Sequence, residues 1–339
     1  MCPQQTWVVR GRSSLLAMAC SLVLAPGCRT AESPGQPSGG AEVPTQSAQL
    51  LQVHHPAVAT LSADGQTLYL VAMDDAGLYQ IYRGPVGTPP GVVTSALTLS
   101  FPVAILVSAD ESQLAIVDYG DAGGESPSGA VFAGPVGGAL ARLGGTAAPT
   151  YPTAGALTAD QRSLYITGRA LPSAGGEAML WQVPLSGGDA VLLYHGTPLS
   201  QPIGLALSSD NTLYVADAQG AQGQGGAIFV SRGDRLLQIN KQPLALTYPN
   251  GLSAAGHGSA DLLFTTTIAT GTEPWLRRIS PNGALQDVVL PALTDATSLS
   301  RAQAVDRWVA IDAVVPNSGS ATTPPPGAGV DGAVLLLSP

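Results

Sequence analysis

The sequence contains very little positive charge. Its 339 residues include a single lysine, Lys241, and the formal net charge at pH 7 is -9. Proteins that hold nucleic acid by its phosphates present clusters of Lys and Arg, because these side chains neutralise the backbone charge. The sequence therefore excludes a phosphate-binding track, and we expect no nucleic-acid partner.

Several catalytic motifs are also missing. The sequence has no Gly-x-Ser-x-Gly elbow, no His-Glu-x-x-His helix, no Cys-x-x-Cys pair and no Walker-type Gly-Lys-Ser/Thr. Charged residues make up 11% and aromatic residues 5%, whereas Gly (41) and Pro (28) are abundant. This composition is typical of many short strands joined by turns and does not suit a helical bundle.

The N-terminal residues have the features of an export signal. Arg10 and Arg12 precede an apolar segment, residues 13–26, that is too short to be a good membrane span. Residues 24–28 then resemble a bacterial lipobox, in which the cysteine carries the lipid. We therefore predict a signal peptide over residues 1–27 and a lipid on Cys28. Ordinary secretory cleavage near this point is the alternative.

Removal of residues 1–27 would leave Cys28 as the only cysteine, so no intramolecular disulfide could form. Residues 28–46 are rich in Pro, Gly and Ser, which is typical of a flexible tether. The expected organisation is a signal peptide, this tether and one folded domain over residues 47–339. Such a protein would be exported and held at a bacterial membrane, in the periplasm or on the cell surface.

One hairpin pattern recurs along the folded part. Residues 201–217 combine two short apolar runs with a polar turn between them, which is typical of a β-hairpin. Similar stretches begin at His55, Phe101, Tyr151, Tyr248 and Asp295. The residue that opens the second strand recurs every 46 to 50 positions, at Leu68, Leu114, Leu164, Leu213, Leu262 and Trp308. Six units of nearly equal length predict an all-β, six-bladed β-propeller.

The predicted blades contain four antiparallel strands each. The last unit ends at Pro339 after its third strand, and an unassigned apolar run at residues 48–53 precedes the first unit. We expect this N-terminal run to complete the last blade and close the ring, because a closed ring avoids the open ends of a linear array.

The repeated features are an x-Pro start, a Ser-x-Asp turn and a Leu-Tyr-hydrophobic second strand. This pattern resembles the six-bladed propeller superfamily that includes TolB-like, NHL-type and gluconolactonase or senescence-marker-protein-like domains. The resemblance covers residues 47–339 and implies the fold. It does not imply one activity, because such folds host unrelated functions.

The blade topology predicts where a site would lie. The first turn of four units is short and contains an aspartate, and we expect structural Asx-turn hydrogen bonds from Asp64, Asp110, Asp160 and Asp210. The longer, irregular connections lie at the opposite end of each blade, together with the x-Pro starts. We therefore expect any binding face at that opposite end.

The residues before the first-strand prolines are unusually aromatic for this sequence. They are His55, Phe101, Tyr151, Gln201 and Tyr248. One hypothesis is that these side chains ring the mouth of the central channel and stack on a sugar or an apolar peptide side chain. The alternative is that each one packs between neighbouring blades.

A metal site is the alternative that the gluconolactonase resemblance implies. Those relatives hold a central cation with Glu, Asn and Asp side chains at the starts of the inner strands, and here only Asn250 matches that pattern. Asn250 alone cannot hold Ca²⁺, which takes six to eight oxygen ligands. Asp217 and Asp295 could add ligands to such a site.

The sequence thus favours an exported, lipid-anchored propeller that acts as a non-catalytic binding module. Its expected partner is an envelope protein, a peptide or a glycan, and it would act as a monomer without a cofactor and touch the membrane only through its lipid. The rival hypothesis is a Ca²⁺-dependent lactonase or esterase with a site around Asn250. A purely structural envelope protein is the third.

Overall fold

A computed structural model of the protein describes residues 44–94, 97–120, 129–170, 175–220, 225–246, 248, 251–266, 275–290, 296–312 and 331–339. The chain divides into two compact units at Ser38 and Gly39, and every described residue belongs to the second unit. The expected signal peptide and Cys28 lie outside the described residues. Within them, no helix is long and apolar enough to cross a membrane.

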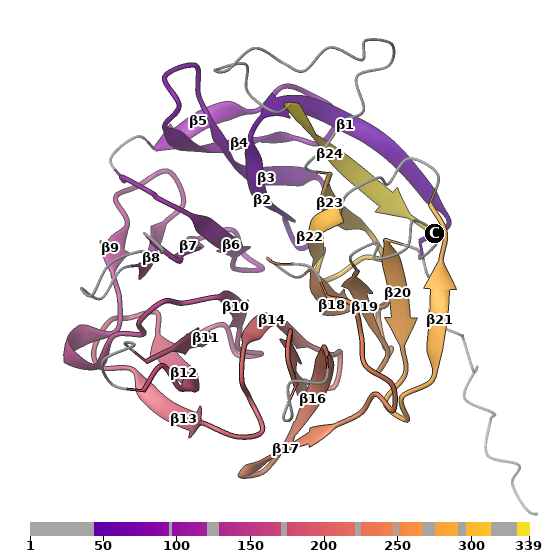
Figure 1. The fold of residues 1–339 in the computed structure, drawn as a ribbon. Coiled ribbons are helices and arrows are strands. Elements are labelled where there is room, and N and C mark those ends of the chain that lie inside the picture. Colours follow the sequence, from indigo (N-terminus) through magenta and orange to yellow (C-terminus); the bar gives the residue numbers. More distant parts are fainter. Residues whose placement is uncertain are drawn as a thin grey trace, which may run out of the picture. The chain divides into compact units, whose positions relative to one another are not determined.

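The second unit consists of six four-stranded antiparallel sheets arranged in a ring (Figure 1). Blade 1 contains β2 (Pro56–Leu61), β3 (Thr67–Met73), β4 (Tyr79–Pro85) and β5 (Gly91–Thr94). Blade 2 contains β6 (Pro102–Val107), β7 (Gln113–Asp118), β8 (Ala130–Pro135) and β9 (Ala141–Arg142). A short 3-10 helix, η1 (Gly145–Ala147), follows β9.

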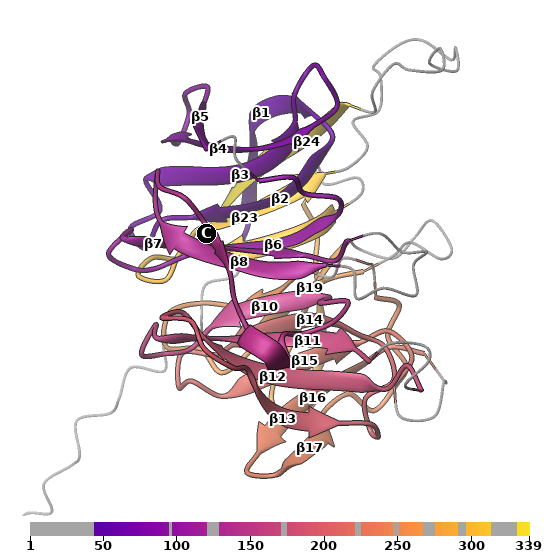
Figure 2. The same ribbon diagram turned by 90° about the vertical axis from the view of Figure 1, so that its left-hand side faces the viewer.

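The next three blades repeat this order. Blade 3 contains β10 (Ala154–Leu157), β11 (Ser163–Arg169), β12 (Ala178–Pro184) and β13 (Val191–His195). Blade 4 contains β14 (Pro202–Leu207), β15 (Leu213–Asp217), β16 (Ala227–Arg232) and β17 (Arg235–Gln238). Blade 5 contains β18 (Leu252–Ala254), β19 (Leu262–Thr265), β20 (Leu276–Ile279) and β21 (Leu285–Val288). In the side view of Figure 2, blade 2 lies between blades 1 and 3.

Blade 6 is built from both ends of the folded unit. It contains β22 (Ala296–Arg301), β23 (Trp308–Asp312) and β24 (Asp331–Ser338), and its outer strand is β1 (Gln46–His54). β1 pairs antiparallel with β24, with Gln46 opposite Ser338. Figure 1 shows the indigo β1 beside the yellow β24. The predicted closure of the ring by an N-terminal strand is confirmed.

The hydrophobic core lies between neighbouring blades. Six clusters of buried apolar side chains each combine two adjacent blades, including the closing pair of blades 6 and 1. In β15, Leu213 and Val215 pack toward blade 3, whereas Tyr214 and Ala216 pack toward blade 5. Because side chains alternate along a strand, each second strand fills the space on both sides of its blade. This explains why the central residues of the second strands are mostly apolar at successive positions.

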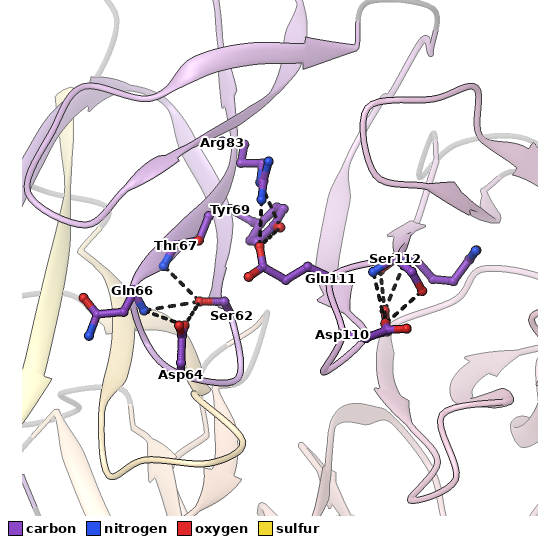
Figure 3. A network of polar contacts seen from close by, with 11 residues as sticks. Ser62, Asp64, Gln66, Thr67, Tyr69, Arg83, Asp110, Glu111 and Ser112 are labelled. Carbon is purple, nitrogen blue, oxygen red and sulfur yellow. Dashed lines mark hydrogen bonds and ion pairs between the residues drawn. The ribbon is translucent and has the colours of Figure 1, made fainter.

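The first turns have the hydrogen bonds that the sequence predicts. In blade 1, Ser62 Oγ donates to Asp64 Oδ1 at 2.6 Å, and the same oxygen accepts the Gln66 N–H at 3.0 Å (Figure 3). Equivalent bonds join Ser108 to Asp110, Thr158 to Asp160 and Ser208 to Asp210. The structural role expected for these aspartates is confirmed.

Candidate functional site

The two ends of the ring differ in their connections. We call the end with the first turns, including Asp64, Asp110, Asp160 and Asp210, the turn face. We call the end at which the inner strands begin the loop face. Pro102 lies opposite Asp118 and Pro202 lies opposite Asp217 in the strand pairing, so the aspartates that end the second strands also lie at the loop face.

Aromatic rings meet at the loop face. The centroid of the Phe101 ring lies 6.1 Å from that of Tyr248 and 6.1 Å from that of Tyr119. Tyr119 lies 6.2 Å from Tyr248 and 5.7 Å from Tyr151. We call these four residues the aromatic cluster. Phe101 and Tyr248 come from blades 2 and 5, which are opposite in a ring of six, so their contact crosses the ring axis.

Three of the five residues predicted for the channel mouth belong to this cluster. Phe101 and Tyr248 remain 40% and 39% exposed, whereas Tyr151 is only 6% exposed and packs in the interior. His55 and Gln201 are half-buried and lie outside the cluster. Tyr151 is thus packed, as the packing hypothesis expects, whereas the rings of Phe101 and Tyr248 remain exposed.

Sequence reasoning missed Tyr119. This residue directly follows Asp118, and its backbone N–H donates to the Phe101 carbonyl oxygen at 2.9 Å. Ala218 occupies the equivalent place in blade 4, where its N–H donates to the Gln201 carbonyl oxygen at 2.8 Å. An aromatic residue at this repeated position was therefore a signal available in the sequence.

The buried aspartates of the loop face hold the backbone. Asp118 accepts hydrogen bonds from the N–H groups of Phe101 at 2.7 Å and Ser100 at 3.0 Å. A longer one comes from Gly120 at 3.4 Å. The carboxylate of Asp118 thus fixes both Phe101 and the chain that carries Tyr119.

Asp217 has the same role in blade 4. Its side chain is fully buried, and its Oδ2 accepts the N–H groups of Ser200 and Gln201, both at 2.8 Å. Its Oδ1 accepts the N–H groups of Gln219 at 3.0 Å and Gly220 at 2.8 Å. Both oxygens are therefore occupied by main-chain donors, which stabilise the carboxylate in the interior.

The residues of the calcium hypothesis are only partly within the described part of the chain. Asn250 and Asp295, which the metal hypothesis requires, lie outside the described residues. Asp217 offers no free pair of oxygens, because four N–H groups already bind it. Across the part of the chain that the structure describes, no three His, Cys, Asp or Glu side chains lie close enough to hold an ion.

The central channel contains a cavity of about 210 Å³ lined by the six inner strands. At the turn face, Gln161 Nε2 donates to Gln303 Oε1 at 3.0 Å, and Gln161 Oε1 accepts the Ala109 N–H at 2.6 Å. Gln161 and Gln303 belong to blades 3 and 6, so this contact also crosses the axis. The cavity therefore lies between a glutamine pair at one end and the aromatic cluster at the other.

Comparison with known proteins finds the fold in solved structures. A gluconolactonase from Xanthomonas campestris shares 17% identity with a TM-score of 0.58, and the match covers 90% of this chain and 99% of that one. The chain has the six-bladed β-propeller fold. A chain in a nidogen–laminin complex matches the propeller with 14% identity and a TM-score of 0.53, over 70% of this chain and 81% of that one.

TolB from Acinetobacter baumannii also matches the propeller, with 14% identity and a TM-score of 0.52. That match covers 68% of this chain and 53% of TolB. No family model and no curated protein matches the sequence. At these identities the likeness establishes the architecture alone. It does not establish a function, because one architecture supports many functions.

Proposed function

We propose that the propeller is a non-catalytic binding module that captures its ligand on the loop face through the aromatic cluster. The observation that carries this proposal is the exposure of Phe101 and Tyr248, at 40% and 39%, beside the half-buried Tyr119. Aromatic side chains supply large contact area with little loss of conformational freedom, so exposed rings on a rigid scaffold are effective anchors.

The polar groups beside the rings favour binding over catalysis. A general acid or base must be free to exchange a proton with a substrate. Asp118 and Asp217 are 4% and 0% exposed, and backbone N–H groups bind their oxygens. Asp118 holds the backbone of Phe101, Asp217 holds the backbone of Gln201, and neither presents a reactive group.

The binding experiment uses calorimetry. Chitotriose, maltotriose and capped Gly-x-Gly peptides would be titrated into the purified protein and into a Phe101→Ala/Tyr248→Ala variant. We expect at least one ligand to bind the native chain and to lose its affinity in the variant. Leu237→Ala, which removes a 50% exposed side chain from an outer strand, is the matched control. Retained affinity in the double variant would refute the proposed site.

We further propose that the protein is exported and lipid-anchored at the bacterial envelope. The support is the charged start, the apolar run and Cys28, followed by the Pro/Gly/Ser-rich tether. Intact-mass measurement of the membrane fraction should give a lipid-modified chain of residues 28–339. A Cys28→Ala variant should leave that fraction, and an unmodified soluble native product would refute the anchor.

A calcium-dependent lactonase or esterase is the second candidate. It is favoured by the match to a gluconolactonase along 99% of that chain. Calcium would be titrated with a lactone and an aryl ester as substrates. Stoichiometric Ca²⁺ binding, with turnover that Asn250→Ala abolishes, would establish this function in place of the binding module.

A further inference from the structure

The arrangement of the aromatic cluster indicates what kind of group it binds, provided that it is the binding site proposed above. The Phe101 and Tyr248 rings are nearly parallel, with 12° between their planes, and Tyr119 stands at 76° and 73° to them. All three centroid separations lie between 6.1 and 6.2 Å. Three ring centres therefore form a compact triangle, and one group above it can lie near all of them.

Such a triangle attracts positive charge. The face of an aromatic ring carries negative electrostatic potential, and a cation within about 6 Å of a ring centroid is attracted to it. Several rings act on one cation at the same time, which is how aromatic cages hold quaternary ammonium groups. Two of these three rings are accessible from solvent, since Phe101 and Tyr248 are each about two-fifths exposed.

A buried carboxylate lies beside the backbone that carries two of the rings. Asp118 accepts the Phe101 N–H at 2.7 Å and directly precedes Tyr119. Its carboxylate is therefore close to the backbone of two of the ring-bearing residues. Within the described residues it accepts hydrogen bonds only from main-chain N–H groups and forms no ion pair. Among these residues, no basic side chain is paired with it.

The field of Asp118 extends to its neighbours. Burial raises the pKa of Tyr79, and the negative charge of Asp118 adds to this increase. Asp217, a second fully buried carboxylate at the loop face, likewise binds only main-chain donors among the described residues. Ring faces and buried carboxylates have the same sign, and the whole chain carries a net charge of -9. The rings and Asp118 therefore favour a cation at the aromatic cluster. Elsewhere at the loop face, the guanidinium groups of Arg142 and Arg169 donate to the carbonyl oxygens of Gly129 and Gly176.

We infer that the aromatic cluster selects an organic cation: a quaternary ammonium group or the Lys or Arg side chain of a partner. A neutral apolar group of the same shape would gain only the contact area. A cation gains the contact area and the attraction of three rings and a buried carboxylate, so charge and not shape decides the preference.

The decisive experiment compares ligands of equal shape by calorimetry on the full-length protein. Choline would be compared with 3,3-dimethylbutan-1-ol, its uncharged isostere, and capped Gly-Lys-Gly with capped Gly-norleucine-Gly. We expect the charged member of a pair to bind roughly 3- to 30-fold more tightly. Its advantage should fall as NaCl rises from about 0.02 M to about 0.5 M, since ions screen exposed charges. The choline pair tests a small ligand, and the peptide pair tests a protein side chain.

Two variants connect this preference to the rings. Phe101→Leu/Tyr248→Leu keeps apolar bulk and removes two ring faces, so the preference for the cation should fall toward onefold while the isostere still binds. Leu237→Ala should retain the native preference. Equal affinity for choline and its isostere, or tight binding of a neutral sugar alone, would overturn the cation inference and leave the binding module standing. Failure of every ligand to bind would overturn both.

Discussion

The turn face and the loop face of the propeller are held together in different ways. On the turn face, side chains and backbone groups of the first turns bond directly to a neighbouring blade. These contacts join Glu111 to Tyr69, Ala109 to Gln161, Ser209 to Ser259, His257 to Asp306, and Ala304 to Ala63. On the loop face, the buried aspartates bond within their own blade, and aromatic rings make the described ring-to-ring contacts between blades.

The two faces therefore differ in role: the contacts of the turn face stabilise the fold, whereas the loop face presents side chains that a ligand can reach. A turn that bonds to the next blade has satisfied its polar groups and offers little to a ligand. At the loop face the hydrogen-bonding groups are satisfied beneath the surface, so the rings above them remain accessible. The same repeated hairpin therefore forms both faces, and the loop face is where we propose binding.

The largest expected effect comes from Asp217, the buried residue that holds the backbone of the loop face in blade 4. Asp217→Ala removes the acceptor of one buried and three partly buried N–H groups, so we expect a loss of roughly 3–5 kcal/mol in unfolding free energy. The measurement is the urea unfolding midpoint. Asp210→Ala, in the exposed first turn of the same blade, is the control and should cost clearly less. Equal losses would show that the two faces do not differ in this way.

Within the aromatic cluster, we expect the buried ring to contribute more to the stability of the fold than the exposed rings do. Tyr151 is 6% exposed, so Tyr151→Ala should destabilise the fold by roughly 3 kcal/mol. Phe101→Ala, at a 40% exposed position, should cost less than half of that loss. Thermal and urea unfolding of the two variants would be compared. If Phe101→Ala proves the more destabilising, the ring is a structural element and not a binding surface.

A smaller effect concerns the contact between blades 1 and 2 (Figure 3). Tyr69 Oη donates to Glu111 Oε2 at 2.5 Å, and the Arg83 guanidinium bonds to both residues. Burial and the bond to Glu111 raise the pKa of Tyr69 to about 12, so the hydroxyl keeps its proton. A double-mutant cycle of Tyr69→Phe and Glu111→Gln should give a coupling of about 1 kcal/mol. Tyr69→Phe combined with Glu177→Gln, at a distant blade, should be additive.

The smallest effect is the acid response of a first turn. The hydrogen bond from Ser108, followed by those from Ser112, lowers the pKa of Asp110 to about 2. Since the unfolded value is about 3.9, the stabilisation by Asp110 is complete above about pH 4 and is lost as the pH falls toward 2. The difference in urea midpoint between the native chain and Asp110→Asn should therefore shrink between about pH 6 and about pH 2.5. A constant difference would contradict the lowered pKa.

Much of the fold could be predicted from the chain alone. The closing strand followed from an apolar run that no complete unit could use, and the Asx turns followed from Ser and Asp two residues apart. The site was predicted only in part. Phe101 and Tyr248 were recognised by their place in the repeat, but their contact depends on two blades on opposite sides of the axis.

The roles of Asp118 and Asp217 were also not predictable. Each aspartate is separated by at least 15 residues from donors such as Phe101 and Gln201, and only strand pairing brings them together. An acidic residue at the end of a strand reads equally well as a metal ligand or as a backbone anchor. The hydrogen-bond partners, and not the residue type, distinguish the two roles.

The sequence by itself determined the hairpins and their number, because strand alternation and turn chemistry act between residues a few positions apart. The closure of the ring, which pairs Gln46 with Ser338, followed from the count of units and the one unassigned apolar run. Only the tertiary structure decided which of the repeated aromatic side chains stay exposed and which meet across the axis. That outcome depends on how the ring brings opposite blades together. It distinguishes Phe101 and Tyr248, which remain accessible, from Tyr151, which the same repeat position buries.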